Sequence, residues 1–256
     1  MNIKVEPFKN NIGASISYDL KLTEPKIINQ IKETLNNYGF VCFRDQNLEP
    51  GEYLRFAEQL GKIKEYPMLK DLENYKGITV VERKESDKGK SYGEGWHTDS
   101  SYLNKTPKYT CLMGKIVKKD EGQTLFASQL ASYEALDQET KDKIENLVGI
   151  FSSAGPISVT RLEREAERGT GKSKDFIAEH LIVKKIGNRK TLYLSPGHTI
   201  AIKNLSEEDS EKLLKFLFNH QTKKEFRNSF FWEKNTIVIW DNHSVIHSAT
   251  PFQGRR

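Results

Sequence analysis

Apolar residues recur at helical spacing in two early stretches of the chain. In residues 24–38 they form one face of a helix, at Ile27, Ile28, Ile31, Leu35 and Tyr38. Thr23 can cap this helix, Pro25 suits its first turn because a missing N–H costs nothing there, and Gly39 ends it. Residues 50–60 repeat the pattern and stop at Gly61. We therefore expect two amphipathic helices before residue 62.

Short runs of β-branched and aromatic residues predict strands between these helices and after them. The expected strands cover residues 40–43, 78–82, 109–117, 124–127, 150–153, 181–185, 191–195 and 236–240. Further helices are predicted over 132–147 and after Ser206, where Asp209 completes an imperfect capping box. Helices combined with many short strands favour an α+β fold around an antiparallel sandwich or barrel. Because no linker interrupts the pattern, residues 1–256 are expected to form a single domain.

The segment 158–180 has the weakest core character of the chain. It contains five basic and five acidic residues and is broken by Gly169-Thr170-Gly171. Two interpretations stay open: a solvated surface loop, or a lid over a functional site, since long loops in compact domains are often functional.

Composition and charge narrow the class of protein. Apolar residues make up 36% of the 256 residues, and no apolar run reaches the roughly 20 residues of a membrane span. The N-terminus lacks the apolar core of a signal peptide, and Cys42 and Cys111 lie in apolar runs as expected for free thiols. We expect a cytoplasmic protein, not bound to a membrane. The net charge of +5 is too dispersed for nucleic acid but could assist binding of an anionic small molecule.

The candidate chemistry begins at His97 and Asp99, in the stretch Trp96-His97-Thr98-Asp99. If this stretch is a strand, the two side chains lie on the same face and can converge on a metal that accepts nitrogen and oxygen. The pair alone is weak evidence, because chance predicts roughly 0.8 such His-x-acid pairs in this composition.

His247 is the candidate third ligand, because it follows the buried run Thr236–Trp240. Two histidines and one carboxylate occupy one face of an octahedron and leave three positions open, a set that favours non-haem Fe(II) and oxygen chemistry. A structural zinc site would be closed by a fourth ligand, and none is evident.

The surrounding motifs resemble those of the Fe(II)/2-oxoglutarate dioxygenases of the taurine dioxygenase and 2,4-dichlorophenoxyacetate dioxygenase (TauD/TfdA) family. The similar segments are Trp96–Tyr102, Trp240-Asp241-Asn242 with His247, Glu121–Thr124, Leu192–His198, Tyr38–Val41 and Gln59–Ile63. Their order and spacing agree with the family from about residue 7 to the end of the sequence.

This resemblance implies a double-stranded β-helix (jelly-roll) core with flanking helices. It implies His97, Asp99 and His247 as iron ligands, and Thr124 with a later arginine as the site for the far carboxylate of 2-oxoglutarate. Arg256 is favoured by spacing, with Arg255 as the fallback; an arginine suits a carboxylate because its planar fork binds both oxygens. Members usually continue with another arginine four residues later. Two interpretations stay open: a truncated C-terminus, or a native end that would put binding of 2-oxoglutarate and of an anionic substrate in doubt.

The reaction implied by the resemblance consumes Fe(II)-bound 2-oxoglutarate and O2, releases succinate and CO2, and hydroxylates a C–H bond of the substrate. Asp99 favours hydroxylation, because related halogenases lack this carboxylate so that a halide can bind the iron. Taurine is not the expected substrate, since Tyr66, Leu69 and Gly93 replace residues of the taurine-specific members.

A small anionic substrate is expected instead: a sulfonate, sulfate ester or carboxylate ether. His198 matches the aryloxyacetate branch, where a histidine can contact the substrate, while Tyr66, Ser101 and Phe151 are further candidates. His243 replaces a family arginine and is expected near the site or on the surface. Two other interpretations stay open: a catalytically silent sensor that binds metal and 2-oxoglutarate, and a demethylase acting on nucleic acid or protein. The sequence also leaves a homo-oligomer open.

Overall fold

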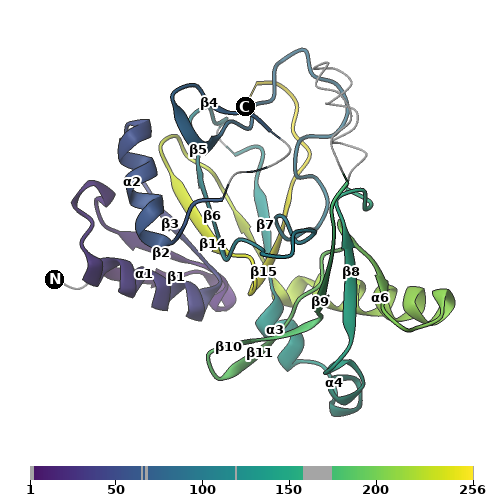
Figure 1. Ribbon diagram of the computed structural model, residues 1–256. Helices are drawn as coiled ribbons and strands as arrows, with labels where there is room; N and C mark the ends of the chain where they lie inside the picture. Colours follow the sequence, from purple (N-terminus) through teal and green to yellow (C-terminus); the bar gives the residue numbers. More distant parts are fainter. Residues whose placement is uncertain (1–2, 65, 67–68, 119, 158–174, 256) are drawn as a thin grey trace.

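The computed structural model describes residues 3–64, 66, 69–118, 120–157 and 175–255. Figure 1 shows helices along two sides of a central group of β-sheets, with the C-terminus near β4 (Asp71–Leu72) and β5 (Tyr75–Thr79). Helices and sheets are therefore mixed along the chain, and the predicted α+β class is confirmed.

The largest sheet has five strands, and one of its inner strands is the apolar run near the end of the chain. Its order is β1 (Lys4–Pro7), β2 (Ala14–Ser17), β3 (Phe40–Phe43), β14 (Ile237–Asp241) and β6 (Tyr109–Met113). The residues of β14 are buried on both faces of the sheet, which explains why its sequence is apolar without alternation. Ile237 and Ile239 face one core cluster, and Val238 and Trp240 face another.

Two helices, α1 (Pro25–Tyr38) and α2 (Pro50–Leu60), pack on the side of Ile237 and Ile239. Both agree with the predicted ranges and begin with proline at the N-terminus. The N-cap of α1 is Glu24, and the predicted cap at Thr23 is wrong, because the Thr23 hydroxyl donates to the carbonyl of Leu20 instead. Gly39 follows α1 with a φ of +79°, a conformation that glycine adopts without strain.

A three-stranded sheet packs on the opposite side of the large sheet. Its central strand is β7 (Thr124–Ser128), between β13 (Arg227–Phe230) and β15 (Val245–Ala249). Phe126 from β7 stacks on Phe40 from β3 with ring centroids 4.1 Å apart, which joins the two sheets through one aromatic core. This packing places β15, and with it His247, beside the strands of the large sheet (Figure 1).

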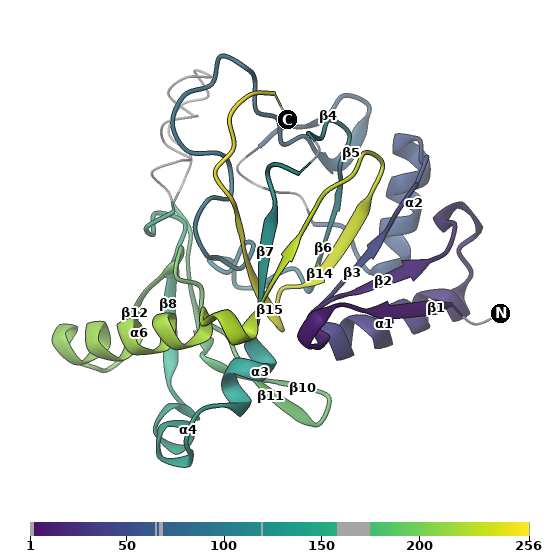
Figure 2. The same cartoon turned by 180° about the vertical axis from the view of Figure 1, so that it is seen from behind.

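The rest of the chain forms a second lobe of helices and strands around its own core (Figure 2). A further three-stranded sheet has the order β12 (Thr199–Ile202), β8 (Val148–Ser152), β9 (Ile177–Leu181), and β10 (Val183–Ile186) pairs with β11 (Arg189–Leu192) as the predicted hairpin. Its helices are α3 (Gln129–Glu134), α4 (Gln138–Ile144) and α6 (Glu207–Gln221). Short 3₁₀ turns lie at Lys9–Asn11, Leu20–Leu22 and Lys224–Phe226.

Several predicted elements differ from the structure, including the strand expected over 109–117, which ends at Met113, and the strand expected over 191–195, which is Arg189–Leu192. The helix expected over 132–147 is divided into α3 and α4, because the carboxylate of Asp137 accepts a 2.7 Å hydrogen bond from the backbone of Thr140 and starts a new helix. The strand expected over 78–82 ends at Thr79. Strand β9 lies in the segment that was expected to be a loop or lid, whose residues 158–174 lie outside the described chain.

Candidate functional site

The first feature of the site is a backbone pairing between His97 and His247. The N–H of each residue donates to the carbonyl of the other, and both distances are 2.9 Å. His247 lies on β15, whereas His97 forms only an isolated bridge and Asp99 lies in a turn. The expectation that His97 and Asp99 share a strand is therefore wrong. They converge because the bridge fixes His97 and the chain then turns at Asp99.

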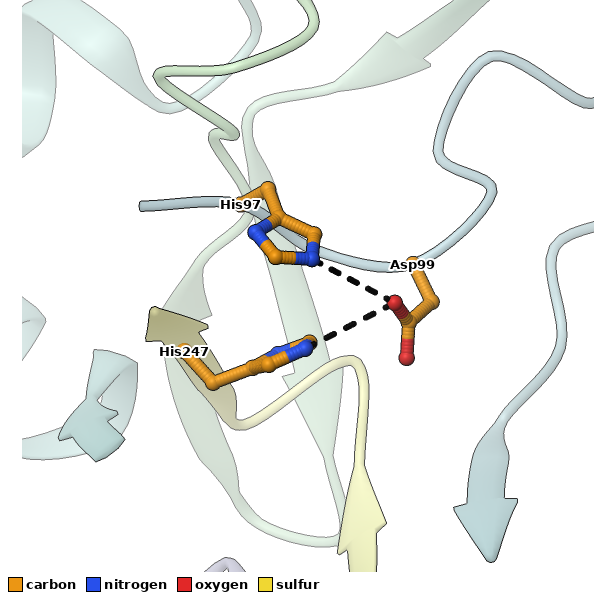
Figure 3. A group of neighbouring side chains, drawn as sticks. All are labelled: His97, Asp99 and His247. Carbon is orange, nitrogen blue, oxygen red and sulfur yellow. Dashed lines mark ion pairs between the residues drawn. The ribbon is translucent and has the colours of Figure 1, made fainter. Parts of the chain in front are cut away.

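The three side chains point toward one another, as Figure 3 shows. Nε2 of His97 and Nε2 of His247 each lie 3.6 Å from Oδ1 of Asp99, and the three ligand atoms all lie within 4.8 Å of one another. Ligands about 2.1 Å from an ion and about 90–120° apart are separated by about 3.0–3.6 Å. The two 3.6 Å separations from Asp99 and the N₂O donor set therefore fit one divalent metal ion.

Neighbouring groups orient both histidines for a metal. Nδ1 of His97 lies 2.8 Å from the carbonyl oxygen of Gly95, which can only accept, so Nδ1 carries the proton and Nε2 keeps its lone pair. His247 is fixed by the rings of Phe126 and Trp240, at centroid distances of 6.0 and 4.8 Å. Burial and the neighbouring His97 lower the pKa of His247 to about 3, so this imidazole stays neutral as a metal ligand requires.

Asp99 is held by its other carboxylate oxygen. Oδ2 accepts hydrogen bonds from the hydroxyl of Thr110 at 2.7 Å and from the indole N–H of Trp240 at 3.1 Å. The side chain of Asn242 donates to Thr110 at 2.8 Å, and its oxygen accepts from the backbone of Asp99 at 3.3 Å. Burial alone would raise the pKa of Asp99, but the two histidines and these hydrogen bonds hold it below its usual value. The carboxylate is therefore ionised, with Oδ1 directed at the histidines.

A cavity of about 860 Å³ opens onto these ligand atoms. Its described walls combine two kinds of side chain. Polar groups surround the ligands, and apolar residues of α2, β5 and β6 line the remainder together with several charged side chains. The polar residues beside the ligands are Thr124, His198, Tyr66, Tyr92 and Tyr102.

Thr124 lies in this cavity and is nearly buried, and its hydroxyl accepts a 2.9 Å hydrogen bond from the indole N–H of Trp232. The hydroxyl proton of Thr124 is thereby left to donate toward a ligand. Arg255 is mostly exposed and pairs with Glu82 at 3.7 Å, and it is not among the described residues that line the cavity. Arg256, the arginine favoured by spacing, lies outside the described residues.

The substrate candidates occupy three different environments. Tyr66 lines the cavity and is hydrogen-bonded to Tyr92 through the two hydroxyls. His198 also lines it, with Nδ1 3.1 Å from the carbonyl of Thr98 and 3.1 Å from the hydroxyl of Ser101, so Ser101 holds His198 instead of facing the cavity. Phe151 is fully buried against Tyr193 and His180 and is not among the described lining residues.

Sequence reasoning missed the residues that support the ligands. Thr110 and Gly95 gave no signal, because a threonine on a strand and a glycine in a loop are common. Asn242 and Trp240 stand in the recognised Trp-Asp-Asn segment, and their nearness to His247 in the sequence was the available signal. His243, expected near the site or on the surface, lies partly buried with Nε2 3.2 Å from the hydroxyl of Thr106.

Comparison with known proteins agrees with this geometry. The sequence model of the family described as "Taurine catabolism dioxygenase TauD, TfdA family" matches residues 4–256. The chain is 27% identical to an alkylsulfatase of Acinetobacter baylyi, over 96% of this chain and 80% of that protein. It is 26% identical to an alpha-ketoglutarate-dependent sulfate ester dioxygenase of Pseudomonas putida, over 99% of this chain and 86% of that protein.

Solved structures show the same likeness. The crystal structure of AAD-2 in complex with Mn(II) and N-oxalylglycine superposes with a TM-score of 0.83 and 25% identity, covering 99% of this chain and 93% of that one. A putative alpha-ketoglutarate-dependent taurine dioxygenase from Burkholderia xenovorans gives a TM-score of 0.79 and 26% identity, covering 98% and 84%.

The chain belongs to the TauD/TfdA family of dioxygenases. It is a 2-oxoglutarate-dependent dioxygenase, and the predictions of family and enzyme class are confirmed. Among the residues that the structure describes, no helix is both long and apolar enough to cross a membrane.

Proposed function

We propose that this enzyme uses Fe(II), 2-oxoglutarate and O2 to hydroxylate a small anionic organic molecule, with release of succinate and CO2. The observation that carries the proposal is the set of His97, Asp99 and His247, whose ligand atoms converge within 4.8 Å at the wall of a large cavity. Two nitrogens and one oxygen on a single side leave the other metal positions open to the cosubstrates.

Iron and 2-oxoglutarate each have proposed binding residues. His97, Asp99 and His247 would hold the iron, which supplies the activation of O2 when bound. Thr124 and Arg256, with Arg255 as the alternative, would bind the far carboxylate of 2-oxoglutarate. N-oxalylglycine, present in the related AAD-2 structure, has the 2-oxoglutarate skeleton with an N–H in place of one methylene, which supports this part of the proposal. The intact carboxylate of Asp99 favours hydroxylation over halogenation.

The protein contributes orientation and protection from water. Thr110 and Trp240 keep the Oδ1 atom of Asp99 aimed at the metal position, and the carbonyl of Gly95 contacts Nδ1 of His97 and so orients its Nε2 toward the same position. The apolar walls of the cavity exclude solvent from the reacting C–H bond. A jelly-roll core, the arrangement that the family implies, would account for the way β7 and β15 present Thr124 and His247 from one sheet.

Two observations support an anionic substrate. The related proteins are named for sulfate esters, sulfonates and phenoxypropionate, all of which are anions at neutral pH. The cavity itself is lined by basic residues in excess: Lys62, Lys64, Arg83, Lys108 and Lys115 against Glu82 and Asp99 among the described residues. Such a wall attracts anions and raises their local concentration. His198 and Tyr66 are the proposed contacts, whereas the enclosed positions of Ser101 and Phe151 favour packing roles.

The decisive experiment measures succinate formation with Fe(II), O2 and a panel of alkyl sulfates, sulfonates and aryloxy acids. Succinate that appears only with iron, oxygen and a panel member supports the proposal. His97→Ala abolishes this succinate, while His220→Gln, at a buried histidine hydrogen-bonded to Ser132 away from the cavity, retains it. Full activity in His97→Ala would remove the ligand assignment.

The same assay, with methylated DNA, RNA and protein added to the panel, separates the other interpretations. A silent sensor would bind metal and 2-oxoglutarate but form no succinate with any panel member. A demethylase would form succinate only with a methylated macromolecule. The comparisons do not favour either, since the named relatives act on small molecules. The single domain over 1–256, the cytoplasmic location and a homo-oligomer stay predictions.

A further inference from the structure

Three tyrosines meet on the cavity wall beside Asp99. Tyr66 and Tyr92 are hydrogen-bonded through their hydroxyls, although they come from different loops. Tyr102 lies next to Tyr66, and both rings are close enough to Asp99 for its charge to act on their pKa values. All three residues line the same cavity as the metal-binding set. This group of phenols, which we call the tyrosine cluster, therefore stands where a substrate would face the metal.

Tyr102 is the unusual member of the tyrosine cluster. Its side chain is only 3% exposed, and its ring packs edge-on against His198 with centroids 5.0 Å apart. Its hydroxyl has no partner with hydrogen-bond geometry among the described residues, although Tyr66 and Ser100 lie nearby. The interactions of this hydroxyl with Tyr66 and Ser100 lack good hydrogen-bond geometry, so an acceptor supplied by a ligand in the cavity would satisfy it better.

The tyrosine cluster can act only as a donor of hydrogen bonds to a negative group. Burial raises the pKa of Tyr66 and Tyr102 well above the ordinary phenol value, and the nearby Asp99 charge acts in the same direction. Both hydroxyls are therefore protonated at neutral pH. A phenol that donates to a charged oxygen makes a stronger hydrogen bond than it makes to a neutral one.

We propose that Tyr66 and Tyr102, with Tyr92 holding Tyr66 in place, bind the oxyanion of the substrate: a sulfate ester, a sulfonate or a carboxylate. This inference rests on the proposed function and specifies how that site selects its substrate. Because phenols carry no positive charge, the tyrosine cluster favours a group with a single negative charge. A sulfate ester fits this requirement, whereas a phosphate ester is largely doubly charged at neutral pH.

The test compares Tyr102→Phe and Tyr66→Phe with a matched control, Tyr193→Phe. Tyr193 is also buried, and its hydroxyl also lacks a hydrogen-bond partner, but it is not among the described residues that line the cavity. For turnover of hexyl sulfate, hexanesulfonate or hexanoate, we expect KM to rise about tenfold or more in the two cavity variants, as for loss of a hydrogen bond to a charged group. The KM for 2-oxoglutarate stays within twofold of wild type, and Tyr193→Phe changes neither.

Calorimetric binding gives a readout that does not depend on turnover. Hexyl sulfate, hexyl phosphate and hexan-1-ol are titrated into the protein loaded with Mn(II) and N-oxalylglycine. We expect hexyl sulfate to bind more tightly than either other probe and to lose at least tenfold in affinity in Tyr102→Phe. An equal loss for hexan-1-ol, unchanged hexyl sulfate affinity, or no binding of any anion by wild type would overturn the inference. Absence of succinate with every substrate would instead overturn the proposed function, whatever the binding result.

Discussion

The hydroxyl of Thr110 donates a 2.7 Å hydrogen bond to Oδ2 of Asp99, the carboxylate oxygen turned away from the two histidines. Thr110 lies on β6 and receives a hydrogen bond from Asn242, which follows β14 directly, so two neighbouring strands of the large sheet control one ligand. The rotation of the Asp99 carboxylate is therefore fixed by the sheet and not by the turn that carries it.

Thr110→Val should weaken metal binding while leaving the protein folded. The substitution keeps the shape of the side chain but removes the donor to Asp99, and losing such a support for a ligand costs about 10–100-fold in metal affinity. Titration with Mn(II) followed by calorimetry measures the change. Thr34→Val is the control, since Thr34 makes a similar hydrogen bond within α1, far from the cavity. Equal metal affinity in both variants would show that Thr110 does not orient Asp99.

Thr124→Val should raise the KM for 2-oxoglutarate by about tenfold, the size expected for loss of a hydrogen bond to a carboxylate. The KM for the organic substrate should change little. Because Trp232 donates to Thr124, the variant also leaves that indole without its acceptor. Trp232→Phe separates the two effects, since it removes the indole N–H but keeps the threonine. A 2-oxoglutarate KM raised equally in both variants would mean that Thr124 acts only by fixing Trp232.

The sequence predicted the elements whose signal is local. Helices α1 and α2 agree with their predicted ranges because apolar spacing, proline at the start and glycine at the end all coincide, and strand β3 agrees because it is a short apolar run directly after Gly39. Long-range pairing carries no such signal. Nothing near His97 in the sequence indicates that it forms a two-way backbone pair with His247. The position of His247 after a buried run and the resemblance to a known family suggested a shared metal, but not this pairing.

The supporting residues of the site were harder to predict than the ligands. Histidine and aspartate are residue types that bind metals, so His97 and Asp99 could be proposed as ligands once further motifs supported them, whereas Thr110 is one threonine among many on strands. Its role depends on the β6–β14 register, in which Thr110 pairs with Trp240. Side-chain packing also cannot be read from the sequence. Phe151 was predicted to contact the substrate, but its ring is enclosed by Tyr193 and His180.

Phe126→Ala should both destabilise the fold and loosen the metal site. The ring of Phe126 is fully buried between Phe40 and His247, so removing it leaves a cavity at the junction of two sheets. Loss of a buried phenylalanine costs about 3–5 kcal/mol of unfolding free energy. Urea denaturation measures that loss, and Mn(II) titration at low temperature, where the variant stays folded, measures the second effect. Phe216→Ala, on the exposed side of α6, should change neither quantity appreciably.

The stability of the protein should fall as the pH rises from about 4 to about 6, because of Asp241. This side chain is 0% exposed, and burial raises its pKa from 3.8 to about 6, against the effects of the His243 N–H and the charges of Lys108 and Lys184. In the unfolded chain the carboxyl ionises near its ordinary pKa, whereas the folded protein holds the proton until about pH 6. The stabilisation is thus complete below the unfolded pKa and lost above the folded one.

Asp241→Asn removes this titration and should make the variant relatively more stable at pH 8 than at pH 4. A pKa raised by about two units corresponds to about 3 kcal/mol. The difference in unfolding free energy between the variant and wild type should therefore change by at most this amount between pH 4 and pH 8. Asparagine keeps an oxygen that can accept the 2.8 Å hydrogen bond from the backbone of His243. Urea midpoints at pH 4, 6 and 8 measure the effect, with the exposed Asp142→Asn as control. A difference between Asp241→Asn and wild type that is the same at all three pH values would show that folding does not raise the pKa of Asp241, as expected if Lys108, whose Nζ lies 3.9 Å from its second oxygen, offsets the effect of burial.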